Sequence, residues 1–404
     1  MINRSTKQLQ ETLWSAPNLP GRAQNLINTK AARIDNDQWM GRVDHRFGDN
    51  NILTGRYSLS DSVSPRPTAH LSVDNLLVTT FTNIMISDTH TVNPTTILDM
   101  KVSYHRNNLQ IADSAPGGKE AIEGFITGNS IQGIPVLKSK AVPLFPQWSI
   151  PGFASPSQTG FPFPDDSYSA YATITKIAGG HTIKAWFEFK HSRNLDDGYF
   201  TGDMSFDKVP TEDPQNAAAT GNAVASCLLG LPTIARRTIG EGTTAIMRKE
   251  DYSLFFQDDW RATANLTVNL GLRCDMSEWP KHRDDLLASI DLGTGQFLWD
   301  GHNPITGEGP NVRRGIVEPD NNNFAPRVGM AYRLGEKTTV RSGFGVFYMT
   351  NYLWEAQSVR GNWPFAISEN FSNLNDRGPV SPVVPLGAVQ RVQQCELREA
   401  QCGF

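Results

Sequence analysis

The stretch YSLFFQDDWRATANLTVNLGLRCDM, residues 252–276, decides the fold class, because it contains two runs of alternating apolar and polar residues joined by a short turn. A β-strand repeats every two residues, so each run forms a ribbon with one apolar and one polar face. Each run has about ten residues, the length of a tilted strand crossing a bilayer, and the polar face carries Arg273 and Asp275, which suits a watery lumen. The apolar row of the second run consists of Leu266, Val268, Leu270, Leu272, Cys274 and Met276. The stretch therefore predicts two strands of a transmembrane β-barrel.

Four further pairs of alternating runs repeat this pattern. They are 38–47 with 52–60, 80–92 with 96–106, 167–177 with 181–191, and 323–334 with 338–348. The joints within pairs are about two to five residues long and rich in Gly, Asn, Asp or Pro, as hairpins require, whereas the connections between pairs are longer. Short turns on one side and long loops on the other are typical of outer-membrane barrels. We therefore predict an all-β fold, a partial antiparallel transmembrane β-barrel of about 10–12 strands with long extracellular loops, the last two strands coming from 198–207 and 233–246.

The long connections and the two ends suggest how the chain is organised. Residues 107–166 are rich in Gly and Pro and predict the longest loop, and residues 277–322 predict a loop with a small hairpin around Gly293 to Gly295. We expect residues 1–34 to be an irregular lead-in and residues 35–350 to be the partial barrel. Residues 351–404 lack sustained alternation and are expected to be a loop or a non-native tail.

Composition excludes several classes of protein. The 404 residues carry a net charge of −4 and are 19% charged, which does not favour a nucleic-acid partner. The longest apolar runs fall short of the roughly 18 residues of a spanning helix, so a helical inner-membrane protein is excluded. The four cysteines are too scattered for a disulfide framework or a zinc site, although Cys395 and Cys402 could pair within the tail. The N-terminus has no secretory signal, so a barrel chain of this sequence is expected to be a fragment.

Charged and aromatic residues mark the two faces of the predicted wall. The lumen-facing candidates are Arg42, Asp44, Arg46, Lys101, Arg273, Asp275, Arg327, Arg333 and Arg341. The candidates for the lipid-facing surface and its aromatic girdle are Trp39, Tyr104, Trp260, Leu270, Leu272, Tyr332 and Tyr348. The charged rows could contact a plug or a substrate, or they could form an ion-pair lattice with Asp44, Asp99 and Asp275 that keeps the lumen wet, and the second interpretation is favoured about two to one.

Two short motifs resemble fragments of catalytic sites. Asp258-Asp259 could supply a carboxylate pair and Asp44-His45 two members of a triad, but adjacent strand residues point to opposite faces. We therefore expect no enzyme and no catalytic site. The loops 300–309 and 318–323 are rich in Asp, Asn and Gly and could hold Ca²⁺, although ordinary turn chemistry is favoured there and no other cofactor is expected.

Several separated segments resemble the barrel of TonB-dependent outer-membrane receptors of the Oar-like branch, in that family's order, over about residues 17–350. They are PNLPG (17–21), DNDQWMGRVDHRF (35–47), LTGRYSLSD (53–61), GGHTIKAWFEF (179–189), TGNAVASCLLGLPT (220–233), YSLFFQDDWRATANLTVNLGLR (252–273) and NNFAPRVGMAYRLGEKTTVRSGFGVFY (322–348). The resemblance implies a location in the cell outer membrane, in contact with its lipid. It also implies uptake of a scarce solute, such as a carbohydrate, peptide or chelate, by an intact protein whose plug domain is driven by TonB–ExbB–ExbD.

The chain departs from the family pattern in ways that limit this expectation. The signal peptide, the carboxypeptidase-regulatory-like domain, the plug and the C-terminal strands have no counterpart in it, and Cys274 stands where an aromatic residue is more usual. We therefore expect a barrel wall that is not competent for transport alone. Two alternatives remain: an outer-membrane adhesion or structural barrel without transport, and a secreted soluble β-protein that binds carbohydrate.

Overall fold

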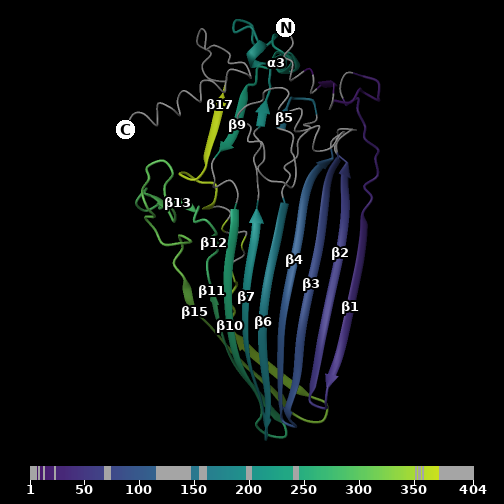
Figure 1. Ribbon diagram of the computed structural model, residues 1–404, viewed down its shortest axis with the longest axis vertical. Helices are drawn as coiled ribbons and strands as arrows, with labels where there is room; N and C mark the ends of the chain where they lie inside the picture. The colour runs from purple at the N-terminus through teal and green to yellow at the C-terminus, as the bar shows by residue number, and fades with distance from the viewer. Residues whose placement is uncertain are drawn as a thin grey trace.

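Ten long antiparallel strands and the two-residue β12 form one 11-stranded sheet in the computed structural model (Figure 1). The structure describes residues 7, 10–11, 14–21, 24–67, 74–114, 147–153, 162–196, 203–239, 245–350, 353, 356 and 359–372. The long strands, in their order across the sheet, are β1 (Asp35–Phe47), β2 (Asn51–Pro67), β3 (Asp74–Asn93), β4 (Thr96–Ser114), β6 (Pro162–Ala178), β7 (His181–Asp196), β10 (Ala245–Arg261), β11 (Leu266–Ser277), β15 (Asp320–Arg333) and β16 (Thr339–Gly345). β12 (Lys281–His282) pairs with β10. The order follows the chain, and β1 and β16 are the two ends of the sheet, so the predicted up-and-down wall is confirmed.

Tight turns join the hairpins at one end of the sheet, which we call the turn end; the opposite end is the loop end (Figure 1). Gly48 and Gly179 have φ angles of 65° and 61°, the left-handed conformation that glycine adopts without a steric penalty. Gly180 is constrained differently, since a Cβ atom there would lie 2.9 Å from the carbonyl oxygen of Arg261. The two glycines of the β6–β7 turn therefore have different roles: Gly179 allows the left-handed backbone conformation, and Gly180 allows the close approach of Arg261.

Several strands extend farther toward the loop end than the alternating pattern predicts. β4 continues to Ser114 and β6 begins at Pro162, inside the region predicted as a loop. β10 begins at Ala245, whereas its alternating pattern starts at Tyr252. Main-chain hydrogen bonds between neighbouring strands need no apolar alternation, so the ladder continues where the side-chain pattern stops. At the other extreme β16 ends at Gly345, so the predicted strand to residue 348 is too long.

A smaller sheet lies at the loop end (Figure 1). Its order is β17 (Ile367–Ser372), β9 (Ile234–Ile239), β8 (Asp203–Ser205) and β5 (Gln147–Ser149), and only the β5–β8 pair is parallel. The segments 198–207 and 233–246 were predicted as extra wall strands. They do contain β8 and β9, but these belong to the small sheet, while the start of β10 takes the end of the second segment. The division of the chain at residues 34 and 350 stays a prediction.

The connection before β9 forms the 3-10 helix η1 (Val209–Thr211) and the short helix α3 (Ala223–Leu229). The side chain of Asn222 caps the N-terminus of α3 by accepting hydrogen bonds from two backbone amides, and Gly230 ends it in the left-handed conformation. Burial of the Cys227 thiol in α3 raises its pKa to about 12. None of the helices in the described ranges is long and apolar enough to cross a membrane.

The loop between β11 and β15 contains the predicted small hairpin, formed by β13 (Ala288–Ile290) and β14 (Phe297–Trp299). Its turn is held by Asp291, which accepts hydrogen bonds from Gly293 and Thr294, and these bonds lower the pKa of the Asp291 carboxyl. Beside this hairpin lies a small apolar core of fully buried residues, which includes two residues at the start of β10. Its members are Ala245, Met247, Leu287 and Ala356.

Candidate functional site

The pairing register gives the large sheet two chemically different faces. Phe256 lies directly opposite Leu272, while the next pair, Phe255 and Arg273, points to the other side. The same alternation continues through every antiparallel pair from β1 to β16. We call the side of Phe256 and Leu272 the apolar face and the side of Arg273 the polar face.

The apolar face is uncovered along the described strands. Its large side chains are exposed from one edge of the sheet to the other, as Val43 on β1 (72% exposed) and Phe344 on β16 (71%) illustrate. Soluble monomers rarely expose contiguous apolar patches larger than a few hundred Å². This exposure argues against the alternative of a secreted soluble β-protein. Further exposed members are Trp39, Ile84, Ile86, Met100, Val102, Ile174, Phe187, Leu254, Leu270, Phe324, Val328, Met330, Tyr332 and Val340.

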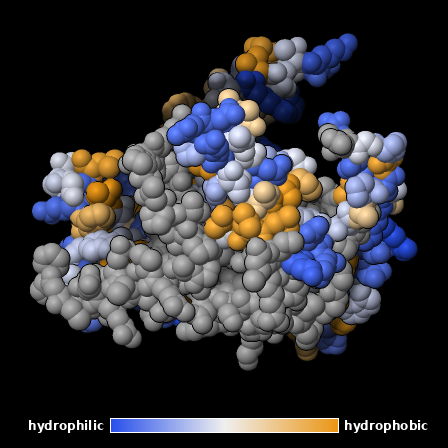
Figure 2. All heavy atoms as spheres, turned by 90° about the horizontal axis from the view of Figure 1, so that it is seen from above, coloured by the Kyte–Doolittle hydropathy of each residue, from blue (hydrophilic) through white to orange (hydrophobic). Residues whose placement is uncertain are grey.

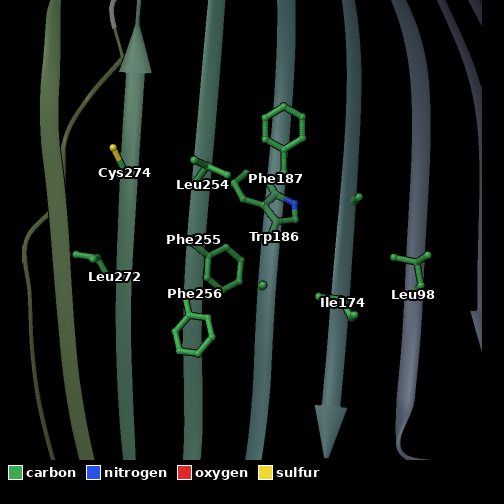
Figure 3. A pocket seen from close by; sticks show the side chains of 11 residues that line it. Leu98, Ile174, Trp186, Phe187, Leu254, Phe255, Phe256, Leu272 and Cys274 are labelled. Atoms are coloured by element: carbon green, nitrogen blue, oxygen red, sulfur yellow. The ribbon is translucent and has the colours of Figure 1, made fainter. Parts of the chain in front are cut away.

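A groove of about 480 Å³ runs across the middle of this face (Figure 3). Side chains from five neighbouring strands line it, among them Leu98, Ile174, Phe187, Leu254 and Leu272. Its lining is almost wholly hydrocarbon, so it is suited to contact with acyl chains.

Aromatic rings lie at both ends of the apolar face. Toward the loop end Tyr104 packs against Tyr168 with ring centroids 4.9 Å apart, and at the turn end His181 stacks on Trp260 at 5.4 Å. Tyr168 and Ala178, at the turn end of β6, are about ten residues apart, or about 33 Å along the strand and about 25 Å after a tilt of roughly 40°. That is the height of the apolar band of an outer-membrane barrel.

The polar face contains ion pairs between residues two apart on one strand. Arg42 pairs with Asp44 at 2.9 Å, and the hydroxyl of Thr54 on β2 donates to the same carboxylate at 2.6 Å. Such contacts fit the ion-pair lattice that was the favoured interpretation of the charged rows.

A second unit of the same kind lies on β10 and β11. Arg273 pairs with Asp275 at 2.8 Å, and Ser253 donates to Asp275 at 2.6 Å. Not every predicted partner is ionic, because Asp99 accepts from the hydroxyl of Thr89 at 2.7 Å. The sequence shows which charges share this face, and the structure adds which of them touch.

Aromatic rings on the polar face were missed from the sequence. Trp186 and Phe255 pack at 5.6 Å, and the guanidinium of Arg273 lies 4.9 Å from the Trp186 ring. Lys101 likewise lies over Tyr171, 5.0 Å from the ring centroid, and donates to its hydroxyl at 2.7 Å. Each ring occupies a polar position of its alternating run, and this parity is the signal that could have found it.

The register places every predicted lumen-facing residue on the polar face. Trp39, Tyr104, Trp260, Leu270, Leu272 and Tyr332 lie on the apolar face. Tyr348 does not belong to a strand, because β16 ends at Gly345. Whether these residues meet lumen and lipid stays a prediction. Of the seven predicted cations, only Arg42 and Arg273 form an ion pair within the described ranges. Lys101 contacts Tyr171 and Arg327 lies over the Phe347 ring instead.

The two catalysis-like motifs are split between the faces. Asp258 lies 2.7 Å from His181, whereas Asp259 accepts from Gln257 at 2.9 Å on the other face. The neighbours Asp44 and His45 are divided in the same way. Within the ranges that the structure describes, no three His, Cys, Asp or Glu residues are grouped as metal ligands.

The loop proposed for Ca²⁺ is organised around a buried carboxylate. Asp300 accepts hydrogen bonds from the backbone amides of Leu287 and Gly315, and its burial raises the pKa of its carboxyl. Calcium binding by this loop and by residues 318–323 stays a prediction. Cys227 and Cys274 are free thiols, and the predicted pairing of Cys395 with Cys402 lies outside the described residues.

Solved outer-membrane transporters are partly similar to this chain. They include FpvA of P. aeruginosa in complex with a ferric pyoverdine, with 10% identity and a TM-score of 0.44 over 77% of this chain and 35% of that one. The copper transporter OprC has 10% identity and a TM-score of 0.43 over 78% and 38%. The ferric-catecholate import receptor Fiu of E. coli K12 has 13% identity and a TM-score of 0.41 over 78% and 47%. The chain thus spans less than half the length of each.

A family model described as an outer membrane beta barrel domain matches residues 1–395, almost the whole chain. No curated protein matches the chain. The family match confirms the barrel region that the resemblance to TonB-dependent receptors implies. With its two-faced antiparallel sheet and this match, the chain belongs to the family of outer membrane beta barrel domains.

Proposed function

We propose that this chain forms part of the wall of a TonB-dependent transporter in the outer membrane, which takes up a scarce solute such as a carbohydrate, peptide or chelate. The observation that carries the proposal is the uncovered apolar face on ten long antiparallel strands, about 25 Å tall between its aromatic ends. The polar face, which carries the Arg42–Asp44 and Arg273–Asp275 ion pairs, then lines the lumen. In this proposal the wall encloses a transport channel and does not catalyse a reaction.

The partners of the intact protein follow from the same proposal. The apolar face contacts outer-membrane lipid, the polar face surrounds a plug domain, and TonB–ExbB–ExbD supplies energy to that plug. The solute is captured at the loop end, where the small sheet and the β13–β14 hairpin gather and where hydrophilic and hydrophobic residues lie side by side (Figure 2). The described chain supplies wall and loops, and its gate would be the plug.

Two measurements test the proposal. Outer-membrane fractions should contain the protein in a form whose electrophoretic migration changes on heating, as a folded barrel requires. Disruption of the gene should reduce uptake of one member of a panel of iron chelates, oligosaccharides and peptides, and a protonophore should abolish the uptake in the parent strain.

The adhesion alternative gives a different result. Loss of surface attachment with unchanged uptake of every solute would replace transport by adhesion. Absence of the heat-modifiable form would contradict the barrel itself.

A further inference from the structure

Four arginines surround a small cavity on the apolar side of the wall, close to the loop end. Arg106, Arg193, Arg248 and Arg283 line it, together with Pro164, Asp166, Leu195 and Ile246, and its volume is about 200 Å³. We call it the arginine cavity. It is separate from the polar face, because three of the four arginines occupy apolar-side positions of β4, β7 and β10.

The cavity lies one row beyond the aromatic end of the apolar face. Arg106 is opposite Asp166, Asp166 is opposite Arg193, and Arg193 is opposite Arg248, so a single cross-strand row holds four of its residues. The row nearest to it toward the turn end contains Tyr104 and Tyr168. In a bilayer that reaches the tyrosine row, this basic row is at the level of the lipid headgroups.

The arginines are not neutralised by the carboxylates around them. Asp166 is 3% exposed and accepts from Arg193 at 2.5 Å and from the Tyr104 hydroxyl at 2.7 Å, with Arg106 farther away at 3.6 Å. Asp284 pairs with Arg283 at 2.7 Å. Four guanidinium groups therefore share two carboxylates, which leaves a net charge of about +2 in the cavity.

Arg248 differs from the other three arginines of the cavity in having no ion pair within the described ranges. Within the described ranges no carboxylate lies within 4 Å of it, and its cross-strand neighbours are Arg193 on β7 and Lys281 on β12. Like charges directly opposite each other destabilise a sheet. An anion held between Arg106, Arg193 and Arg248 would convert this repulsion into charge-assisted hydrogen bonds.

We propose that the arginine cavity binds the phosphate group of a membrane-lipid headgroup, which rests on the proposed function of the chain as a membrane wall. Guanidinium groups match phosphate oxygens in a bidentate geometry, and the acyl chains of the same lipid would lie on the apolar face beyond Tyr104 and Tyr168. The lipid belongs to the leaflet at the loop end. Its phosphate would link strands β4, β7 and β10 with the loop residue Arg283.

The test uses the full chain folded in vesicles of neutral phosphatidylcholine, with or without a minor fraction of phosphatidic acid as the phosphate-bearing probe. Native mass spectrometry counts the retained lipid, and urea titration measures stability. The wild-type chain is expected to retain phosphatidic acid and to unfold at higher urea in its presence. The R106Q/R248Q variant should bind it at least about tenfold more weakly, because it loses two charge-assisted contacts.

Two further variants control for charge and for folding. R33Q/R313Q removes two arginines that lie outside the cavity, and it should retain the lipid like the wild type. R248K keeps the charge without the planar guanidinium group and should give intermediate binding of phosphatidic acid. If R106Q/R248Q does not fold, weaker binding by R248K than by the wild type tests the proposal in its place.

The outcomes separate the possible anion sources. Equal retention of phosphatidic acid by wild type and R106Q/R248Q would overturn the proposal, as would stabilisation by free inorganic phosphate equal to that by the lipid. A wild-type chain that shows heat-modifiable migration but retains no phosphatidic acid overturns the cavity assignment alone. A chain without heat-modifiable migration in the vesicles overturns the proposed wall, and the lipid site with it.

Discussion

Two neighbouring residues of β6 allow the two faces of the wall to be compared with one identical substitution. Ile174 is 44% exposed on the apolar face and contributes to its groove. Thr173 precedes it, points to the polar face and lies directly opposite Asp99 on β4. Arginine introduced at either site has the same size and charge, so only the surroundings differ.

The expected cost follows from the depth of Ile174 in the apolar face. It lies about six residues from Tyr168 and about four from Ala178, so it is near the middle of the band (about 3.3 Å per residue). Arginine on the lipid face of a barrel costs about 2–4 kcal/mol at the bilayer midplane. At about 1.4 kcal/mol per tenfold, Ile174→Arg should lower the folding equilibrium about 25- to 700-fold, whereas Thr173→Arg should change it by less than about 1 kcal/mol because Asp99 faces the new charge.

Urea titration of folding into phospholipid vesicles, followed by heat-modifiable migration, measures both variants. In a soluble protein Ile174→Arg would alter a half-exposed surface position and change stability by only about 0.5 kcal/mol. Equal effects at the two positions, or a larger loss for Thr173→Arg, would refute the assignment of the apolar face to lipid.

Three more predictions test the local structure. Asp275→Ala should cost about 1.5–3 kcal/mol in the same titration, because it leaves Arg273 without its carboxylate partner; an unchanged urea midpoint would contradict the lattice. Gly180→Ala should destabilise by about 1–3 kcal/mol because its Cβ would meet an opposing carbonyl at 2.9 Å, while Gly335→Ala, with no atom within 4 Å, should be near neutral. The Cys227 thiol, with a pKa of about 12, should stay unlabelled by maleimide between about pH 7 and 9 until the protein is unfolded; peptide mapping that finds it modified in the folded protein would contradict its burial.

Most of the wall could be predicted because its determinants are local. The alternation of residues 252–276 specifies a two-faced ribbon, and turns such as the one at Gly179 and Gly180 specify antiparallel hairpins. The extensions of β4 and β6 toward the loop end could not be predicted, since they depend on main-chain pairing with neighbours rather than on side-chain pattern. The same limit applies to β8 and β9, which pair in the small sheet with strands distant in the chain.

The alternation of odd and even positions along each strand predicted that the charged candidates share one face. It could not predict which of these side chains contact one another. The contact of Thr54 with Asp44 requires the β1–β2 register, and that of Arg273 with Trp186 requires three strands in register. A hairpin turn sets the first register, whereas no short turn links β7 to β10. The contacts of rings such as Trp186 on the polar face could therefore be recognised only in the assembled sheet.

That this chain makes hairpins with one apolar and one polar face follows from the amino-acid sequence alone, because both properties depend on residues close together in the chain. The row that Arg106, Asp166, Arg193 and Arg248 form next to the tyrosines depends instead on how distant strands pair in the assembled sheet. These four residues come from four strands, two of whose junctions are long connections. The register across such junctions is fixed by side-chain packing and the hydrogen-bonded ladder of the whole sheet, which no local pattern encodes.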